Sequence, residues 1–209
     1  MLQTDNLTFR YKKEGQIFKF PNIALDENEN LLILGKSGIG KTTFLHLLAG
    51  LLSPTDGKVV IDDVSINLLF QSKLDTFRGQ KIGLVFQKNY AVKSLSVLEN
   101  LYARLFFSKK TIDNDEIDKL LEQLGIKDSK NSKIHELSEG QLQRLGIALS
   151  VIHKPKIILA DEPTSSLDDE NCKVVIELLK NQAERTHANL IVITHDQRIK
   201  TFFQNSITL

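Results

Sequence analysis

The eight residues 35–42, with the sequence GKSGIGKT, constrain this chain more than any other stretch. They match the pattern G-x-x-x-x-G-K-[ST], and they stand between an apolar run at 31–34 and a segment at 43–52 patterned as a helix. Glycines let the backbone wrap around phosphate oxygens, so that N–H groups and the helix N-terminus face the anion. The pattern therefore predicts a phosphate loop between a strand and a helix, rather than a glycine-rich turn that matches by chance.

The last residues of this pattern have expected roles of their own. Lys41 should reach the β- and γ-phosphates of a nucleotide, and the Thr42 hydroxyl should ligate Mg²⁺. The residues expected to hold the nucleotide from this side are Gly35, Lys36, Ser37, Gly38, Ile39, Gly40, Lys41, Thr42 and Thr43. The loop alone thus predicts binding of a nucleoside triphosphate with Mg²⁺.

Composition limits the remaining possibilities. The 209 residues, 41% hydrophobic and 25% charged, are typical of one globular domain. The net charge of +1 gives no argument for nucleic acid or anionic lipid. The single cysteine, Cys172, excludes an intrachain disulfide and a cysteine-based zinc site. Residues 1–15 carry no apolar signal core, and the apolar stretch 44–52 is too short to span a bilayer, so we expect a soluble protein.

Polar residues follow short apolar runs at four separated places. Gly35, Gln87, Asp161 and His195 each come directly after a run typical of a β-strand. In an open parallel α/β sheet, ligands bind outside the carboxyl ends of the strands. If these strands are parallel, the four residues converge on one edge. The sequence therefore predicts an α/β fold with a single site.

Asp161 and Glu162 end one of these apolar runs, and their carboxylates are costly there unless they are paired or near a metal. We expect Asp161 to hold Mg²⁺, directly or through water, and Glu162 to polarise the attacking water as general base. The alternative is a pair of surface acids at a strand end. The phosphate loop makes that alternative the weaker one.

Residues 137–144, LSEGQLQR, are similar to the L-S-G-G-Q signature of the ATP-binding cassette (ABC) ATPases, and the chain resembles this family over nearly its whole length. The resemblance implies an α/β fold: a P-loop NTPase (RecA-like) core with an antiparallel β subdomain and an inserted α-helical subdomain. Residues 1–209 would form a single nucleotide-binding domain. Its core and β subdomain would be 1–87 and 154–209, and its helical subdomain 88–153. Glu139 departs from the family by replacing the first signature glycine.

The resemblance also implies roles for three residues of the ATP site. Tyr11 would stack on adenine, with Phe9 as the alternative stacker, or be only a strand-end aromatic of the core. Gln87 would reach Mg²⁺ or the attacking water, against the alternative of a polar residue at a turn. His195 would contact the γ-phosphate, although an isolated histidine after a strand is more often structural.

In the family, a second copy completes the site. Ser138, Gly140 and Gln141, at the start of a predicted helix 140–153, form a second anion-binding helix end. That end covers ATP bound by another copy, so the resemblance implies a head-to-tail dimer around two ATP. Asp168 would lie across the dimer interface in the motif 165–168; the alternative role, compatible with the first, is the N-cap of a helix at 169–186.

The implied activity is hydrolysis of ATP to ADP and phosphate, coupled to transport or mechanical work. The partner would be an integral membrane permease that holds the chain at the cytoplasmic face of the inner membrane. Residues 78–87 and 95–100 resemble the lipoprotein-releasing, macrolide-exporter and cell-division subset. One alternative is a soluble ABC ATPase acting on nucleic acid or ribosomes. The chain lacks a coiled coil, a second cassette and a basic, aromatic-interleaved patch, so no nucleic acid partner is expected. A second alternative, a binding module without turnover, is disfavoured because Glu162, Gln87 and His195 are all present.

Overall fold

Two β-sheets carry the fold, and the computed structural model describes residues 1–87, 90–165 and 167–209. In the first sheet the strands are hydrogen-bonded in the order β10-β4-β9-β8-β7, and every pair is parallel. These strands are Asn30–Leu34 (β4), Ile82–Val85 (β7), Ile157–Asp161 (β8), Asn189–Thr194 (β9) and Asn205–Thr208 (β10). Strands β8 and β9 are buried along their whole length. Burial on both faces explains why their sequences are nearly continuous apolar runs.

The second sheet is antiparallel and comes from the N-terminal part of the chain. Strand β1 pairs with β2, β3 and β5, and β5 also pairs with β6. The strands are Leu2–Phe9 (β1), Phe18–Lys19 (β2), Ala24–Leu25 (β3), Asp56–Ile61 (β5) and Val64–Ser65 (β6). The antiparallel pairing of β1 with β2 and β3 agrees with the antiparallel β subdomain that the family resemblance implied.

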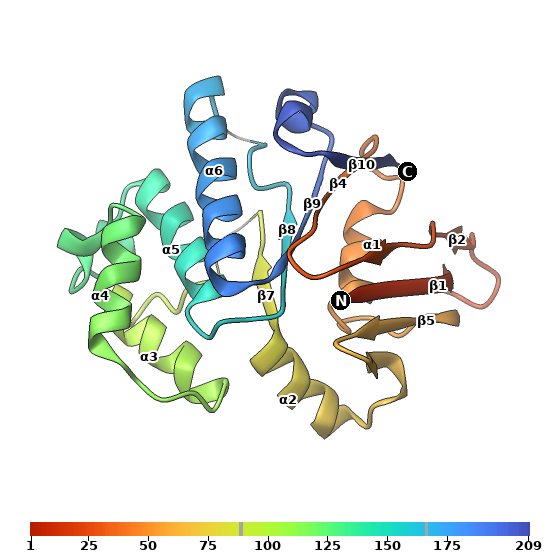
Figure 1. Cartoon of the computed structure of the whole chain (residues 1–209), viewed down its shortest axis with the longest axis horizontal. Helices are drawn as coiled ribbons and strands as arrows, with labels where there is room; N and C mark the ends of the chain where they lie inside the picture. Colours follow the sequence, from red (N-terminus) through yellow and green to blue (C-terminus); the bar gives the residue numbers. More distant parts are fainter. Residues whose placement is uncertain (88–89, 166) are drawn as a thin grey trace.

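Helices flank the parallel sheet, and α3 and α4 lie at the end of the molecule away from the antiparallel sheet (Figure 1). The α-helices of the described residues are Lys41–Leu48 (α1), Gln71–Lys81 (α2), Val97–Phe107 (α3), Asn114–Gln123 (α4), Glu139–Val151 (α5) and Asp169–Thr186 (α6). Short 3-10 helices cover Ile66–Leu68 (η1), Lys127–Ser129 (η2), Ile134–Glu136 (η3) and Gln197–Phe202 (η4).

The parallel sheet is the middle layer of the molecule, since the hydrophobic core divides along its two faces. On β4, Leu32 and Leu34 belong to the core that α3, α4, α5 and α6 complete. Leu31 and Ile33 belong to the other core, which α1 and the antiparallel sheet complete. Successive residues of a strand point to opposite faces. The α/β fold class expected from the sequence is therefore the one observed.

One helix and one helix start differ from the sequence prediction, and the helix predicted at 140–153 is observed as Glu139–Val151. Helix α2 was not predicted, because its sequence is mostly polar and only Leu74 is buried. Helix α1 begins at Lys41 and not at residue 43, since Gly40 adopts the left-handed conformation that ends the loop. The phosphate-loop lysine is thus the first residue of the helix and not the end of the loop.

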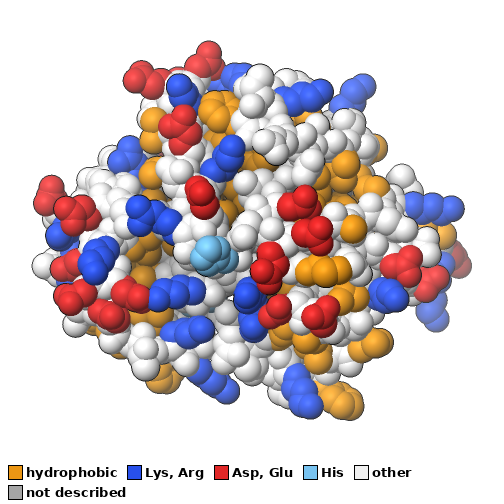
Figure 2. All heavy atoms as spheres, in the orientation of Figure 1, with side chains coloured by type: hydrophobic (Ala, Val, Ile, Leu, Met, Phe, Trp, Pro, Cys, Tyr) orange, Lys and Arg blue, Asp and Glu red, His pale blue; other side chains and the backbone are white. Residues whose placement is uncertain are grey.

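Charges of both signs are interspersed on the face shown in Figure 2. The mixture accords with the near-neutral net charge of the chain. Among the described residues, no helix has the length and apolar character needed to cross a membrane.

Candidate nucleotide-binding and hydrolysis site

The phosphate loop turns from β4 into α1, and two of its positions require glycine. Gly38 and Gly40 have φ angles of 81° and 108°, in the left-handed region that L side chains avoid. A Cβ on Gly40 would also lie 2.9 Å from the Phe18 ring. The loop is anchored at its start, where the Gly35 N–H donates to the Thr194 carbonyl at 3.3 Å. Glycine at positions 38 and 40 is therefore required by the backbone path itself.

Lys41 is buried and is held by the loop that it follows. Its Nζ donates to the carbonyls of Gly35 at 2.9 Å and Lys36 at 3.2 Å. It also forms an ion pair with Glu162, with Nζ 3.2 Å from Oε1. The ammonium group is thus fixed between the phosphate loop and the end of β8.

The predicted Mg²⁺ ligands Thr42 and Asp161 meet across 119 residues of sequence. The Thr42 hydroxyl donates to Asp161 Oδ2 at 3.0 Å, while Asp161 Oδ1 is buried and has no hydrogen-bond partner. Burial raises the pKa of Asp161 above its ordinary value, and the hydrogen bond from Thr42 opposes this only in part. A hydroxyl and a carboxylate are ligands that Mg²⁺ prefers. A cation at this place would satisfy the buried oxygen and favour the ionised carboxylate, so these residues fit the metal.

The described residues hold no cluster of three or more His, Cys, Asp or Glu side chains that could bind a metal. Mg²⁺ commonly takes one or two protein ligands and completes its shell with water and substrate phosphates. The Thr42–Asp161 pair is consistent with that mode of binding.

Glu162 lies at the centre of a network of donors. It accepts hydrogen bonds from the Thr194 hydroxyl at 2.7 Å and from Nδ1 of His195 at 3.0 Å. Burial raises its pKa, but the bonds from His195, Thr194 and Lys41 together outweigh it, so the pKa of Glu162 lies below its ordinary value. Its φ of 49° is unusual for a residue other than glycine, and such strain clusters at functional sites. Glu162 is therefore held ionised, as a proton acceptor must be.

Gln87 lies two residues after the end of β7, and its side chain points towards Ser165. Its Nε2 donates to Ser165 Oγ at 3.2 Å. Among the described residues, Ser165 is its hydrogen-bond partner, and Gln87 contacts neither Thr42 nor Asp161 in this way. Its predicted role as a Mg²⁺ ligand therefore remains a prediction. Ser166, in the same predicted motif as Ser165, lies outside the described residues.

Tyr11 and Phe9 differ in their exposure to solvent. The Tyr11 side chain is 64% exposed, whereas Phe9 is 8% exposed and belongs to the core. The two rings meet edge to face at 4.8 Å, and the Tyr11 hydroxyl lies 2.8 Å from Thr43 Oγ1. Of the two aromatic residues, Tyr11 is the one with a face open to a ligand next to the phosphate loop.

The signature segment caps helix α5 and leaves its N-terminus open. The Ser138 hydroxyl accepts from the Gln141 N–H at 3.2 Å, and the Gln141 side chain accepts from the Ser138 N–H at 2.9 Å. This capping box satisfies two backbone donors and fixes both side chains. Gly140 is exposed, and a Cβ there would meet nothing within 4 Å. None of these groups hydrogen-bonds to the phosphate loop, so α5 has an exposed N-terminus separate from it, and its binding of an anion remains a prediction.

Asp168 caps helix α6, as one interpretation of the sequence predicted. It accepts from the Asn171 N–H at 2.8 Å and from Asn171 Nδ2 at 2.9 Å. Its predicted position across a dimer interface is compatible with this role, because the carboxylate stays exposed.

Sequence reasoning missed Arg198, which links the loop after β9 to the start of α6. Its guanidinium donates to Asp196 Oδ2 at 2.8 Å, to Asp169 Oδ1 at 2.5 Å and to the Leu167 carbonyl at 3.2 Å. Asp196 also accepts from the Thr164 hydroxyl at 3.0 Å. The acid after His195 was visible in the sequence, but nothing in the pattern indicated that Arg198 would reach 31 residues back.

Comparisons with known proteins agree on one family. The family described as ABC transporter matches residues 18–165. The lipoprotein-releasing system ATP-binding protein LolD of Treponema denticola is 36% identical over 92% of this chain and 86% of its own length. LolD of Syntrophus aciditrophicus is 34% identical over 100% of this chain and 96% of its own.

Solved structures give the same result. The dimeric structure of MJ0796, a bacterial ABC transporter cassette, has a TM-score of 0.88 and 33% identity, covering 100% of this chain and 94% of that one. A dimeric post-hydrolysis state of MJ0796 with ADP and Pi has a TM-score of 0.86 and 35% identity, with the same coverage. CbiO1 from Clostridium perfringens, part of the cbiONQ transporter complex, has a TM-score of 0.87 and 27% identity, covering 99% of this chain and 83% of that one.

Proposed function

This chain belongs to the ABC transporter family, and from that premise we propose that it drives a membrane permease that docks in a groove beside Gln87. As an ABC ATPase it binds ATP with Mg²⁺ and hydrolyses it to ADP and phosphate.

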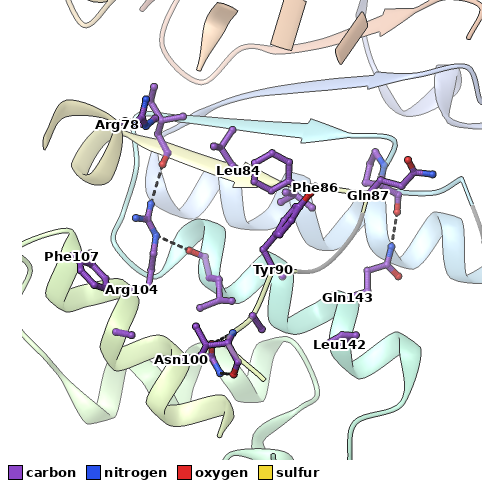
Figure 3. A pocket seen from close by; sticks show the side chains of 18 of the residues that line it. Arg78, Leu84, Phe86, Gln87, Tyr90, Asn100, Arg104, Phe107, Leu142 and Gln143 are labelled. Carbon is purple, nitrogen blue, oxygen red and sulfur yellow. Dashed lines mark hydrogen bonds between the residues drawn. The ribbon is translucent and has the colours of Figure 1, made fainter. Parts of the chain in front are cut away.

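The observation that supports it most is a cavity of about 870 Å³ between β7, α3 and α5. Its walls include Leu84, Phe86 and Tyr90, and Gln87 lies at the end opposite Arg104 (Figure 3). The cavity lining extends to Glu162. A protein segment seated in this groove would contact Gln87 and lie next to the proposed general base. Gln87 would then take part in both the docking of the permease and the hydrolysis of ATP.

The chemistry follows from the geometry of the charged groups. Lys41 and the backbone N–H groups of the loop bind the phosphates and stabilise charge on the γ-phosphate. Glu162, held ionised, accepts the proton of the attacking water, and His195 holds Glu162 in place through Nδ1. Mg²⁺ on Thr42 and Asp161 would neutralise negative charge on the β- and γ-phosphates.

The second half of the site is proposed to come from another copy. The exposed end of α5, with Ser138, Gly140 and Gln141, offers N–H groups and a helix dipole to an anion. MJ0796, which is similar over the whole chain, has been solved as a dimer. We propose the same head-to-tail arrangement here, in which residues 88–153 carry the signature to the partner's ATP.

The similarity to LolD proteins points to lipoprotein release as the work performed. In that role the chain would sit at the cytoplasmic face of the inner membrane, held there by its permease. The alternative is a soluble ABC ATPase that has no membrane partner.

The catalytic assignment is tested with Glu162→Gln. Removing the base should lower the hydrolysis rate at least about 100-fold while ATP binding persists, so that an ATP-bound dimer accumulates. ATPase assays and light scattering with Mg-ATP measure both effects. Glu184→Gln, on the outer part of α6, is the matched control, and unchanged hydrolysis in Glu162→Gln would remove the assignment.

The partner is tested by purifying the tagged chain from native membranes. An integral membrane protein should co-purify, and the pair should release a lipoprotein from proteoliposomes when ATP is added. Recovery of the chain only from the soluble fraction, or together with nucleic acid, would favour the soluble alternative.

A further inference from the structure

The first turn of α1 carries two neighbouring hydroxyls that different parts of the chain hold in place. Thr42 donates to Asp161 Oδ2 at 3.0 Å, whereas Thr43 Oγ1 lies 2.8 Å from the Tyr11 hydroxyl. Thr43 is buried, and within the described part of the chain Tyr11 is the hydrogen-bond partner of its side chain. A threonine inside a helix often bonds instead to a carbonyl of the preceding turn. The orientation of the Thr43 hydroxyl is therefore set by a residue 32 positions earlier in the chain.

The chemistry of phosphate decides which of these two hydroxyls should donate. Phosphate oxygens accept hydrogen bonds, and each hydroxyl has a single proton to give. The N-terminal turn of α1 attracts an anion, so a Thr43 proton directed at phosphate requires Tyr11 to donate to Thr43 Oγ1. A phenol is the better donor of the two, and successive hydrogen bonds strengthen one another. The Tyr11 hydroxyl thus leaves the Thr43 proton available to an anion.

A second contact joins the same part of the chain to the phosphate loop. Phe18 lies at the start of β2, opposite Phe9 of β1, and it is partly buried. Its ring is so near the loop that a Cβ on Gly40 would lie 2.9 Å from the Cδ1 atom. The same ring meets Tyr11 edge to face, with 6.2 Å between the ring centroids. Phe18 therefore lies against both the end of the phosphate loop and Tyr11.

Further aromatic rings support Phe18 from the core. Phe18 and Phe20 are nearly parallel, with centroids 6.4 Å apart, and Phe20 stacks on Phe44 of α1 with centroids 4.7 Å apart. Both Phe20 and Phe44 are buried. A close-packed interior transmits strain, because few voids are left to absorb a displacement. The row of rings therefore ties the β1–β2 hairpin, residues 2–19, to the loop and to the helix that follows it.

We infer that Tyr11, through its hydroxyl, and Phe18, through its contact with Gly40, are positioning residues that arrange the phosphate loop and Thr43 for binding phosphate. The inference rests on the proposed nucleotide site and adds this arrangement to it. Stacking on adenine needs only the ring of Tyr11 and acts on the base. Positioning needs the hydroxyl and acts on the phosphates, so the two roles can be measured separately.

The first test measures the binding of inorganic triphosphate, which has no base, and of ATP, both with Mg²⁺, by isothermal titration calorimetry. Tyr11→Phe keeps the ring and loses the hydroxyl, and it should weaken the binding of both ligands by the same factor, roughly five-fold. Tyr102→Phe is the matched control, because its hydroxyl donates to Asn114 Oδ1 in the helical part of the chain and both affinities should stay unchanged. Triphosphate binding that is unchanged in Tyr11→Phe would overturn the inference.

Phe18→Leu tests the contact with the loop. The smaller side chain leaves Gly40 without part of its support, so triphosphate and ATP should both bind at least about three-fold more weakly. Phe77→Leu, on α2 and partly buried against the same core, is the matched control and should leave both affinities unchanged. A loss confined to ATP in Phe18→Leu would assign Phe18 to the base alone and overturn its positioning role.

A double-mutant cycle measures the link between the two hydroxyls with Mg-ATP alone. Thr43→Val and Tyr11→Phe each remove one hydroxyl of the pair, so the double variant should bind ATP about as weakly as the weaker single variant. If its affinity falls by the product of the two single factors, the inference is overturned.

Lys41→Ala tests the nucleotide site itself, and it should weaken the binding of both ligands more than any of these changes. Wild-type affinity in Lys41→Ala would overturn the proposed site, whereas a loss there with unchanged affinities in Tyr11→Phe would overturn the positioning role only. Circular dichroism and the melting temperature verify folding of each variant.

Discussion

At the scale of single residues, the candidate metal site is marked by Asp161, whose two carboxylate oxygens lie in different surroundings. Oδ2 accepts from the Thr42 hydroxyl, whereas Oδ1 is buried without a hydrogen-bond partner. Burial raises the pKa of this group. A raised pKa means that the folded state binds the proton more tightly than the unfolded state, so the ionised carboxylate lowers stability above that pKa. The ionised carboxylate of Asp161 therefore lowers the stability of the fold, but it favours the binding of a cation.

We predict that Asp161→Asn melts at a higher temperature than the wild-type chain at pH 7.5 without nucleotide, by about 2 °C. Asparagine removes the buried charge and still accepts the hydrogen bond from Thr42. Mg-ATP should raise the melting temperature of the wild-type chain much more than that of the variant, because ligands stabilise the state that binds them. Differential scanning fluorimetry with Mg-ATP, and with ATP and EDTA, measures both effects.

Asp168→Asn is the control, and it should shift the melting temperature in the opposite direction. Hydrogen bonds from Asn171 lower the pKa of Asp168, so its ionised form supports the fold above its ordinary pKa. Its replacement should lower the melting temperature. If both variants shift it in the same direction, the argument from the two environments is wrong.

Much of the site at this scale was predictable from spacing. Thr42 and Asp161 were both expected to hold Mg²⁺, and the structure has their side chains in contact at 3.0 Å. The choice between Tyr11 and Phe9 was open in the sequence, since exposure depends on the tertiary fold. Thr194, which donates to Glu162, was not predicted because a hydroxyl at a strand end has many equivalent uses.

At the scale of elements, Arg198 ties β9, η4 and α6 into one unit beside His195. Its two acidic partners, Asp169 and Asp196, have different surroundings. The Asp196 side chain is 8% exposed and that of Asp169 is 87% exposed. Hydrogen bonds from Arg198 lower the pKa of Asp196 to about 2 against opposing burial. Exposed ion pairs contribute little to stability, so the pairing with Asp196 should dominate.

We predict that Asp196→Asn lowers the free energy of unfolding at pH 7 by about 1–2 kcal/mol. A carboxylate with a lowered pKa stabilises the fold above its unfolded pKa, near 3.9, and that contribution is lost as pH falls towards 2. The gap between variant and wild type should therefore close between about pH 5 and pH 2. Urea unfolding across this range measures it, with Asp169→Asn as a control expected to change stability by less than about 0.5 kcal/mol. A gap that stays constant down to pH 2 would contradict the assignment.

Helices and strands were predictable where the burial of one face imposes a periodic pattern of apolar residues, and not elsewhere. The helix expected at 169–186 is observed as Asp169–Thr186, because its apolar residues recur on one face and Asp168 caps it. Helix α2 has one buried residue, so no apolar period marks it, although Arg78 and Leu74 join it to Gly50 and the core.

At the scale of the whole molecule, the chain carries two proposed half-sites, the phosphate loop and the N-terminus of α5, and among the described residues no hydrogen bond joins them. The phosphate loop with Lys41 starts at β4 of the central sheet. The open end of α5 with Ser138 lies in the helical part and makes its hydrogen bonds there, with Gln141 bonded to Ser129. A head-to-tail dimer related by a two-fold axis would bring each half-site to its complement twice.

We therefore predict that two inactive variants restore activity when mixed. Lys41→Ala removes the phosphate-binding cation, and Ser138→Arg blocks the open helix end, so neither chain alone should hydrolyse ATP appreciably. In a mixed dimer, the Lys41 of one chain meets the Ser138 of the other, which leaves one complete site and one doubly defective site. Random pairing of equal amounts makes about a quarter of all sites complete, so the mixture should reach up to about a quarter of wild-type activity. ATPase assays across mixing ratios, with a maximum expected at equal amounts, measure this. A chain that hydrolyses ATP within one copy would show no gain on mixing, and the double variant added to either single variant should likewise give none.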